Sequence, residues 1–420
     1  MKRTNTVRVV PTKNQEQLLE VLADRSAALW NTVQHRCRQA FFKKEPLPSY
    51  AKLCAEFKDH PAYKALPAHV GQEIIKKART AWNSFFACLR LFRSGKLAKA
   101  PRIPGYWKDR KTGKRKAKVI PVKAATSYSL DSKHLSLTLP ADMRNGQRLV
   151  LQTKGVLRFT GAPKTLELKR DPVRKRWYAR QVVDVPEPAR LPKPEKHAAL
   201  DLGARTLVAL AIQGLSQQIL FSGREVWKDF LYWTKQIAKE QARLAQDGRK
   251  TSRKLRRLYQ MRAGRLKHAL TALAAEIARV LKRHGVTVLH IEDLAGIRDG
   301  MGFGPRNLLV HNFWAFGMIR NLIVQACGRI GIKVRADAPK DSLVCAVCEG
   351  ALRRRPRHKV FCKKCGAVWH SDANAAAYSL GSSKERGAEA APGKPLALRW
   401  NKHRWTSRAE SPACRDRKAA

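Results

Sequence analysis

Residues 198–221 read AALDLGARTLVALAIQGLSQQILF, a stretch in which short apolar runs alternate with glycine and polar residues. The runs have the length and composition of buried strands, and they cover Ala198–Leu202, Leu207–Ile212 and Gln218–Phe221. Gly203 and Gly214 separate these runs and mark points where the chain can turn sharply. The stretch therefore predicts three successive strands joined by short turns.

The segments that follow extend these strands into a larger domain. A helical periodicity covers residues 227–283 and is broken near Asp247, which predicts a hairpin of two helices. An apolar strand at residues 286–291, a helix at 312–331 and a strand at 332–336 come next, and a short Ala-rich helix ends the series. The order β-β-β-α-β-α-β-α is that of an RNase H-like α/β domain, in which helices flank a mixed sheet.

The first half of the chain has a different pattern. Residues 11–118 carry helical periodicity and end in a basic loop, which begins at Lys96. Apolar residues then recur with a period of two between residues 119 and 185, and they predict several short strands of a small β-barrel. Thr4–Val10 is a further strand that could complete this barrel. A Pro-rich linker at residues 186–194 follows, so we expect a multidomain α+β protein.

The chain is strongly basic. Its 420 residues include 85 Lys and Arg against 32 Asp and Glu, which gives a formal net charge of +53. Self-repulsion of such a charge opposes compaction unless a polyanion neutralises it, so nucleic-acid phosphate is the expected partner. No apolar run approaches the roughly 20 residues of a membrane-spanning helix, and no secretory apolar stretch follows Met1–Asn5. We therefore expect a cytoplasmic protein with no membrane partner.

Four of the nine cysteines form two closely spaced pairs. These are Cys345-x2-Cys348 and, after thirteen residues, Cys362-x2-Cys365. Each C-x-x-C turn can present two thiolates to one metal, and two such turns complete a tetrahedral Zn²⁺ site. Redox use of the cysteines is the alternative in a cytosolic chain. Gly350 and Gly366 follow the two pairs, where a positive φ would be tolerated.

Three carboxylates occupy comparable places in the predicted elements. Asp201 and Glu292 end apolar strands, and Asp372 opens the Ala-rich helix. In an RNase H-like sheet the first and fourth strands are neighbours and the last helix packs over their ends, so the three residues would meet at one rim. Two-metal phosphodiester hydrolysis needs such converging carboxylates, and they predict a site for Mg²⁺ or Mn²⁺. Taken singly, each residue could instead end a turn or cap a helix.

At these positions the chain resembles the TnpB proteins of bacterial transposons and the related compact type V CRISPR effectors. The shared motifs are Leu200-Asp201-Leu202-Gly203, Ile291-Glu292-Asp293-Leu294, the four-cysteine ribbon, Asp372-x-Asn374-Ala375-Ala376, Pro11-Thr12…Gln15 and Phe313-Trp314-Ala315-Phe316. The resemblance extends over roughly residues 4–380. Tyr378 replaces an asparagine that is frequent in the family, and Glu349 follows Cys348 in place of a frequent glycine. Neither departure removes a metal ligand.

The resemblance implies an RNA-guided DNA endonuclease with a RuvC-type site. Asp201, Glu292 and Asp372 would then be the catalytic metal ligands, with Asn374 supporting them. Guide RNA and target DNA would be the partners, at the nucleoid of a prokaryote. A guided DNA-binding repressor with weak or no cleavage and an unguided RuvC-type nuclease are the alternatives. Whether the chain serves a transposon or CRISPR antiviral defence, and whether it is a monomer or a dimer, stays open.

The resemblance also implies a division into domains. The expected parts are a wedge-like barrel (1–10 and 119–190), a helical recognition lobe with the basic loop (11–118), a RuvC-like nuclease domain (195–342 and 368–380), a zinc ribbon (343–367) and a disordered tail (381–420).

Overall fold

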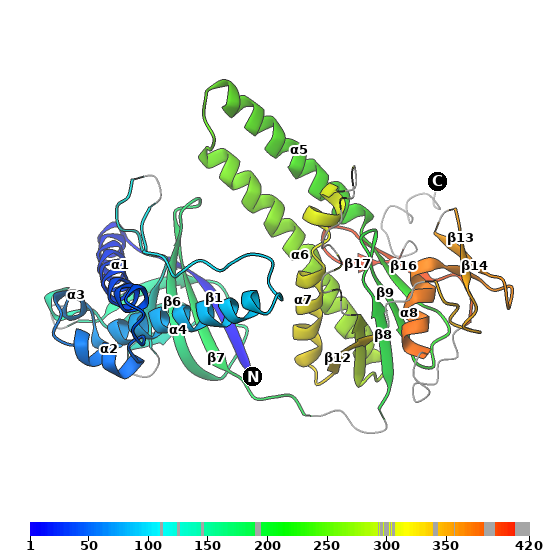
Figure 1. The fold of residues 1–420 in the computed structure, drawn as a ribbon, viewed down its shortest axis with the longest axis horizontal. Coiled ribbons are helices and arrows are strands. Elements are labelled where there is room, and N and C mark those ends of the chain that lie inside the picture. Colours follow the sequence, from blue (N-terminus) through cyan, green and yellow to red (C-terminus); the bar gives the residue numbers. More distant parts are fainter. Residues whose placement is uncertain are drawn as a thin grey trace. The chain divides into compact units, whose positions relative to one another are not determined.

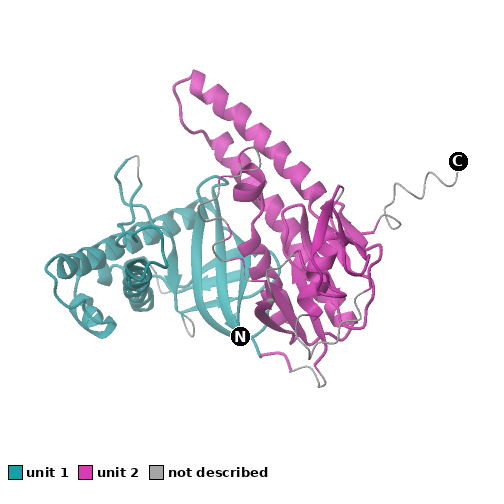
Figure 2. Cartoon of the chain, turned by 45° about the vertical axis from the view of Figure 1, so that its right-hand side comes forward, with its two compact units in different colours: residues 1–186 teal, residues 187–420 magenta. Residues whose placement is uncertain are grey.

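The computed structural model (Figure 1) describes residues 1–109, 112–123, 127–143, 147–189, 195–292, 294, 297, 302, 304, 307–338, 343–356, 358–381 and 391–407. The chain forms two compact units, residues 1–186 and 187–420, which Figure 2 shows in different colours. This division falls at the start of the Pro-rich linker, of which residues 190–194 lie outside the described part. Among the described helices, none is both long and apolar enough to span a membrane.

Unit 1 contains a seven-stranded sheet in the order β2-β6-β7-β1-β5-β4-β3. Its strands are β1 (Lys2–Val10), β2 (Ile120–Val122), β3 (Tyr128–Leu130), β4 (His134–Leu137), β5 (Leu149–Lys154), β6 (Ala162–Asp171) and β7 (Arg176–Asp184). Strand β1 begins the chain yet lies between β7 and β5, antiparallel to both. The hydroxyl of Tyr128 on edge strand β3 donates to the carbonyl of Lys164 on β6 at 2.9 Å. The sheet therefore curls until its two edges approach each other.

Four helices separate β1 from the rest of this sheet, namely α1 (Lys13–Phe42), α2 (Tyr50–Phe57), α3 (Pro61–Lys64) and α4 (Ala68–Arg93). The capping box predicted at the start of α1 is confirmed, because Thr12 and Gln15 exchange side-chain to backbone hydrogen bonds. Helix α4 packs against α1 through the fully buried Trp82, whose indole N–H donates to Gln34 at 3.0 Å.

Unit 2 also contains a seven-stranded sheet, in the order β12-β11-β8-β9-β10-β16-β17 (Figure 1). Its strands are β8 (His197–Asp201), β9 (Thr206–Ile212), β10 (Ile219–Ser222), β11 (Val288–Glu292), β12 (Lys333–Ala338), β16 (Leu396–Trp400) and β17 (Trp405–Thr406). Strand β8 pairs antiparallel with β9 and parallel with β11. The first and fourth strands of the unit are therefore neighbours, as the sequence predicts.

One face of this sheet is covered by α5 (Arg224–Gln246), α6 (Arg253–Arg283) and α7 (Phe316–Gly328). Helices α5 and α6 form the predicted hairpin, and Gly248 in the turn between them has a φ of 65°. Leu273 and Ile277 of α6 pack in one core with Ala198 and Leu200 of β8. A π-helical turn, η3 (Leu308–Phe313), precedes α7, so the single helix expected over this region is divided.

The opposite face is covered by α8 (Ser371–Gly381), on the far side of the sheet from α6 and α7 in Figure 1. The contact consists largely of alanine, and it brings Ala373, Ala376 and Ala377 of α8 against Ala199, Ala209 and Ala211 of β8 and β9. Small side chains on both sides let the helix approach the sheet closely.

The prediction of a disordered tail over residues 381–420 is wrong for residues 391–407. Strand β16 adds to the sheet in parallel with β10, and β17 pairs back on β16. Trp405 packs edge-on against Phe221 with ring centroids 5.6 Å apart, and both rings belong to the core of the unit. The apolar run is too short to show a period, and it becomes a strand because β10 presents an open edge. Residues 382–390 and 408–420 lie outside the described part.

Candidate active site and metal ribbon

Asp201 is placed by the last residue of β8 and the turn that follows it. The strand before it is buried, with Ala199 and Leu200 fully enclosed. A Cβ at Gly203 would lie 2.6 Å from the carbonyl oxygen of Thr206, so a larger residue would collide with the start of β9. The glycine therefore permits a tight exit, and the Asp201 carboxyl stays at the end of the sheet.

Glu292 ends the neighbouring parallel strand β11. The register pairs His290 with Ala199 and Ile291 with Leu200. One step further along both strands, Glu292 comes level with Asp201, and paired residues of adjacent strands point to the same face. That face is the one that α8 covers.

Asp372 lies in the first turn of α8, where the helix dipole favours a negative charge. Its carboxylate accepts a hydrogen bond from the hydroxyl of Ser371 at 3.0 Å, and its backbone N–H donates to Nδ1 of His370 at 3.3 Å. Because α8 packs on β8 and β9, its first turn approaches the end of β8.

The electrostatics at Asp201 report that the three carboxylates are near one another. Burial raises the pKa of Asp201, and repulsion from Asp372 and Glu292 raises it in the same direction, to about 7. Each of the three residues keeps partial exposure. The three carboxylates thus form a partly exposed cluster of negative charge at the end of the sheet. A divalent cation bound there would relieve the repulsion between them.

The donor set of this cluster suits hard cations such as Mg²⁺ or Mn²⁺, which prefer carboxylate oxygen. Among the residues that the structure describes, the four cysteines form the one group of possible ligands whose atoms all lie within 4.8 Å of one another.

The four cysteines adjoin a small three-stranded sheet of β13 (Leu352–Arg355), β14 (Lys359–Cys362) and β15 (Val368–His370). Cys362 ends β14, and the other three lie in the segments before β13 and after β14. Their sulfur atoms are 3.7 Å apart for Cys345 and Cys365 and 3.4 Å apart for Cys348 and Cys362. A tetrahedron with Zn–S bonds of about 2.3 Å has edges of about 3.8 Å. The donors and their spacing therefore fit a Zn²⁺ ion.

The ribbon acts on its thiols in opposite directions: hydrogen bonds to the other cysteine side chains raise the pKa of Cys365 to about 12, whereas Cys362 is favoured as a thiolate. The backbone N–H of Cys365 is the main cause that lowers the pKa of Cys362, to about 6. Gly366 has the expected positive φ of 72°, but in the first turn Glu349 takes the positive φ, at 57°. Gly350 is therefore not required for a positive φ, and that expectation is wrong. A Cβ there would lie 3.1 and 3.2 Å from two cysteine sulfurs, so Gly350 is needed for space.

Asn374 connects the ribbon to α8. Its side chain is fully buried, its Oδ1 accepts from the backbone N–H of Ala346 at 3.0 Å, and its Nδ2 donates to the carbonyl of Val344 at 2.7 Å. Asn374, which lies two residues after Asp372, thus binds the first cysteine turn to α8. The role expected from the resemblance, direct support of the carboxylates, stays a prediction.

A buried histidine pair beside the carboxylates escaped the sequence reasoning. Nδ1 of His197 on β8 lies 3.1 Å from Nε2 of His290 on β11, and Nδ1 of His290 lies 2.6 Å from Oδ1 of Asp337 on β12. The two histidines precede Asp201 and Glu292 by four and two residues, so all four share a face of the sheet. This even spacing on two apolar strands was the available signal.

Comparison with known proteins places the chain among similar sequences and folds. Residues 180–298 match the family model OrfB_IS605, described as a probable transposase. The TnpB-like protein ORF457 of Acidianus two-tailed virus is 30% identical over 409 residues, covering 89% of this chain and 85% of that protein. The structure of the mini-RNA-guided endonuclease CRISPR-Cas_phi3 aligns with a TM-score of 0.52 and 11% identity, covering 92% of this chain and 93% of that one, which indicates a shared fold. A Cas12f1–sgRNA–target DNA complex aligns with a TM-score of 0.35 and 14% identity, covering 90% of this chain and 98% of that one.

Proposed function

Because this chain belongs to the TnpB family, we propose that it is an RNA-guided DNA endonuclease with a RuvC-type two-metal active site. The observation that supports the proposal is the repulsion that Asp372 and Glu292 exert on Asp201, which ends strand β8. The neighbour with the shared fold is named as an RNA-guided endonuclease, which agrees with it. The net charge of +53 supplies the attraction for guide RNA and target DNA.

The residues of the chain divide the work of cleavage among them. Divalent cations bound by the three carboxylates would activate a water molecule and stabilise the leaving oxygen. Asp201 is repelled by both other carboxylates, so a cation bound at the cluster would contact Asp201 as its central ligand. Asp372 lies in the first turn of α8, at the positive end of the helix dipole. The zinc ribbon fixes the start of α8 through Asn374 and so restricts where Asp372 can lie.

The domain assignments follow from the same proposal. The curled sheet of unit 1 corresponds to a wedge domain, and helices α1 to α4 correspond to a recognition lobe. The unit 2 sheet with its helices corresponds to the RuvC-like nuclease domain, with the ribbon at residues 343–367 inserted before α8. Residues 391–407, which the sequence predicted to be part of a disordered tail, are assigned to this nuclease domain because β16 pairs with β10.

Substitution of Asp201 by Asn tests the active site. The variant keeps the size of the side chain and removes its charge, so we expect Mg²⁺-dependent cleavage to fall by roughly a thousandfold or more, while nucleic-acid binding persists. Asp247→Asn, at the exposed tip of the helical hairpin, is the matched control and should cleave normally. Undiminished cleavage by the Asp201→Asn variant would remove this carboxylate from the mechanism.

The guided part of the proposal has its own test. The purified full chain should carry a discrete RNA species, visible on a denaturing gel after protease treatment. If the protein cleaves DNA in the absence of any such RNA, the unguided nuclease is the correct function. If RNA is present and neither Mg²⁺ nor Mn²⁺ supports cleavage of matched DNA, the chain is a guided binding protein.

A further inference from the structure

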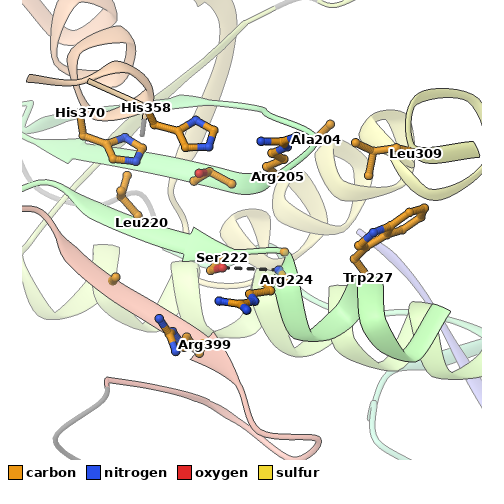
Figure 3. Close-up of a pocket in the computed structure, with 13 residues that line it drawn as sticks. Ala204, Arg205, Leu220, Ser222, Arg224, Trp227, Leu309, His358, His370 and Arg399 are labelled. Atoms are coloured by element: carbon orange, nitrogen blue, oxygen red, sulfur yellow. Dashed lines mark hydrogen bonds between the residues drawn. The ribbon is translucent and has the colours of Figure 1, made fainter. Parts of the chain in front are cut away.

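A cavity of about 570 Å³ opens in unit 2 (Figure 3). Its wall is formed by segments that are far apart in the sequence. They are the turn after β8, the ends of β10 and β16, the first turn of α5, and the histidines of the ribbon. A volume of this order is that of a small-molecule site, within about 300–1,000 Å³. One or two nucleotides fit in such a volume, whereas it is too small to enclose a duplex.

The cavity and the carboxylates share one face of the sheet. Asp201 pairs with Ala209 on β9, Ala209 pairs with Leu220 on β10, and Leu220 pairs with Ala397 on β16. Paired residues of adjacent strands point to the same side, and both Leu220 and Ala397 line the cavity. Two strand spacings, or about 10 Å, therefore separate Asp201 from this wall. A chain bound in the cavity continues directly to the proposed catalytic centre.

The charge of the cavity is uniformly positive. Arg205, Arg224 and Arg399 contribute guanidinium groups from three different elements, and none of the described residues that line the cavity is acidic. Figure 3 shows Arg205 between the histidines and Trp227, with Arg224 and Arg399 below them in this view. The planar guanidinium fork binds phosphate oxygens in pairs, so three of them on a concave surface suit a phosphodiester backbone.

The first turn of α5 adds to this preference for anions. Its N-cap is Gly223, which has no side chain to satisfy the free N–H groups of a 23-residue helix. The hydroxyl of Ser222 accepts one of these N–H groups, that of Arg224, at 3.4 Å. The other N–H groups of the turn and the positive end of the helix dipole support a phosphate placed at the arginines.

Aromatic rings bound the cavity at its two ends. His358 and His370 stack with ring centroids 5.7 Å apart and planes within 12° of parallel. Trp227 stands at the other end and is half-buried, with Phe230 stacked nearly parallel to it at a centroid distance of 5.9 Å and Phe313 in a T-shaped contact. Unpaired bases stack on such rings, whereas the bases of a duplex are already stacked and enclosed. The combination of rings and arginines therefore matches a single strand.

We propose that this cavity holds one or two nucleotides of the single-stranded DNA substrate next to the phosphate to be cut. Arg205, Arg224 and Arg399 contact the backbone, and Trp227 and the two histidines receive the bases. The word substrate rests on the endonuclease function proposed above, but the binding itself does not. Arg399 comes from β16, so the C-terminal strand contributes a positioning residue for the substrate.

Photochemical cross-linking tests the proposal without requiring cleavage. A single-stranded DNA of about ten nucleotides that contains 5-iodouracil is irradiated with the full chain carrying Asp201→Asn, and the joined peptides are identified by mass spectrometry. We expect cross-links in the peptides that contain Trp227, His358 or His370. Arg224→Gln combined with Arg399→Gln should reduce them by at least about tenfold. Arg404→Gln, an exposed arginine beside the same strands, is the matched control and should have no effect.

Two further experiments complete the test. One distinguishes a lost phosphate contact from structural damage to β16, and the other distinguishes DNA from RNA as the bound strand. Arg399→Lys retains the charge, so it should restore most of the cross-linking that Arg399→Gln loses. Equal losses in both variants would contradict the proposed contact. An RNA probe of the same length identifies the source of the strand, and the substrate assignment is wrong if RNA alone reaches the cavity. Cross-links confined to peptides elsewhere in the chain would overturn the proposal.

The outcome is distinguishable from failure of the proposed function. Cross-linking in the cavity by a wild-type chain that never cleaves DNA would retain the binding site and refute the nuclease. Cleavage together with an empty cavity would retain the nuclease and refute this path for the strand.

Discussion

At the scale of single residues, Asp201 stands out because burial and two like charges act on it together. The unfolded chain releases the Asp201 proton near pH 3.8, whereas the folded chain retains it up to about pH 7. The folded state therefore binds more protons between these values, and the free energy of unfolding falls as the pH rises through this window. The site is strained at neutral pH unless a cation compensates it.

This strain predicts the stability of a variant. In buffer without divalent cations, Asp201→Asn should be more stable than the wild type at pH 8, by on the order of a few kcal/mol, and equally stable near pH 4. Thermal unfolding between pH 4 and pH 8 measures the difference. Added Mg²⁺ should raise the melting temperature of the wild type more than that of the variant. Parallel stability curves for the two proteins would show that Asp201 titrates normally.

Asn374 carries the second prediction at this scale. Asn374→Ala leaves the N–H of Ala346 and the carbonyl of Val344 without this partner, which should cost about 1–3 kcal/mol. Because these groups fix the first cysteine turn, the variant should also release Zn²⁺ to a chelator faster. Tyr378→Ala, on the same helix and partly exposed, is a suitable comparison. Unchanged zinc release would mean that the ribbon holds its shape without α8.

At the scale of elements, the C-terminal strands show what a short segment can contribute. Leu398, Trp400 and Trp405 bury apolar surface against unit 2. A chain that ends at residue 390 should therefore lose several kcal/mol of stability relative to the full chain. A chain that ends at Ser407 keeps both strands and should match the full chain. Urea unfolding compares the three, and equal midpoints would show that β16 and β17 are dispensable.

The same strands mark the limit of inference from sequence. Strands β8 to β10 were predictable because each is a continuous apolar run, and the hairpin was predictable from its one-sided stripe of leucines. Strand β16 depends on an open edge of β10, and β3 has three residues, too few for a period. The hydrogen bonds of Asn374 and the histidine pair depend on which strands become neighbours. The convergence of the carboxylates was predictable through the strand order, whereas the arginine cavity was not.

At the scale of the whole molecule, the chain holds its cores within its two units. One core draws its residues from unit 1, and the two cores that include β8 and α8 draw theirs from unit 2. Within unit 1, β1 pairs with strands that follow more than a hundred residues later, across the four helices. This pairing is non-local, so a sequence pattern can suggest the strand but cannot assign its partners.

The separate cores predict independent folding. Residues 1–186 and residues 187–420, expressed as two proteins, should each unfold cooperatively, because each retains its own sheet and core. Circular dichroism during thermal unfolding measures this for both fragments. The full chain should then show two transitions or one broadened transition. A fragment that lacks any cooperative transition would show that its core requires the other unit.

The alanine contact between α8 and the sheet has a consequence for how the proposed nuclease would lose activity. The alanine methyl groups determine the distance between the helix and strands β8 and β9. When two methyl groups, or a methyl and a hydroxyl, are added to such a tightly packed contact, the helix has to move, because the sheet beneath is covered on both faces. Asp372 would move with it, away from Asp201. A variant can thus keep every carboxylate and every cysteine and still lose the spacing between carboxylates that metal ions require. A single Ala→Val or Ala→Thr substitution in this contact would be enough.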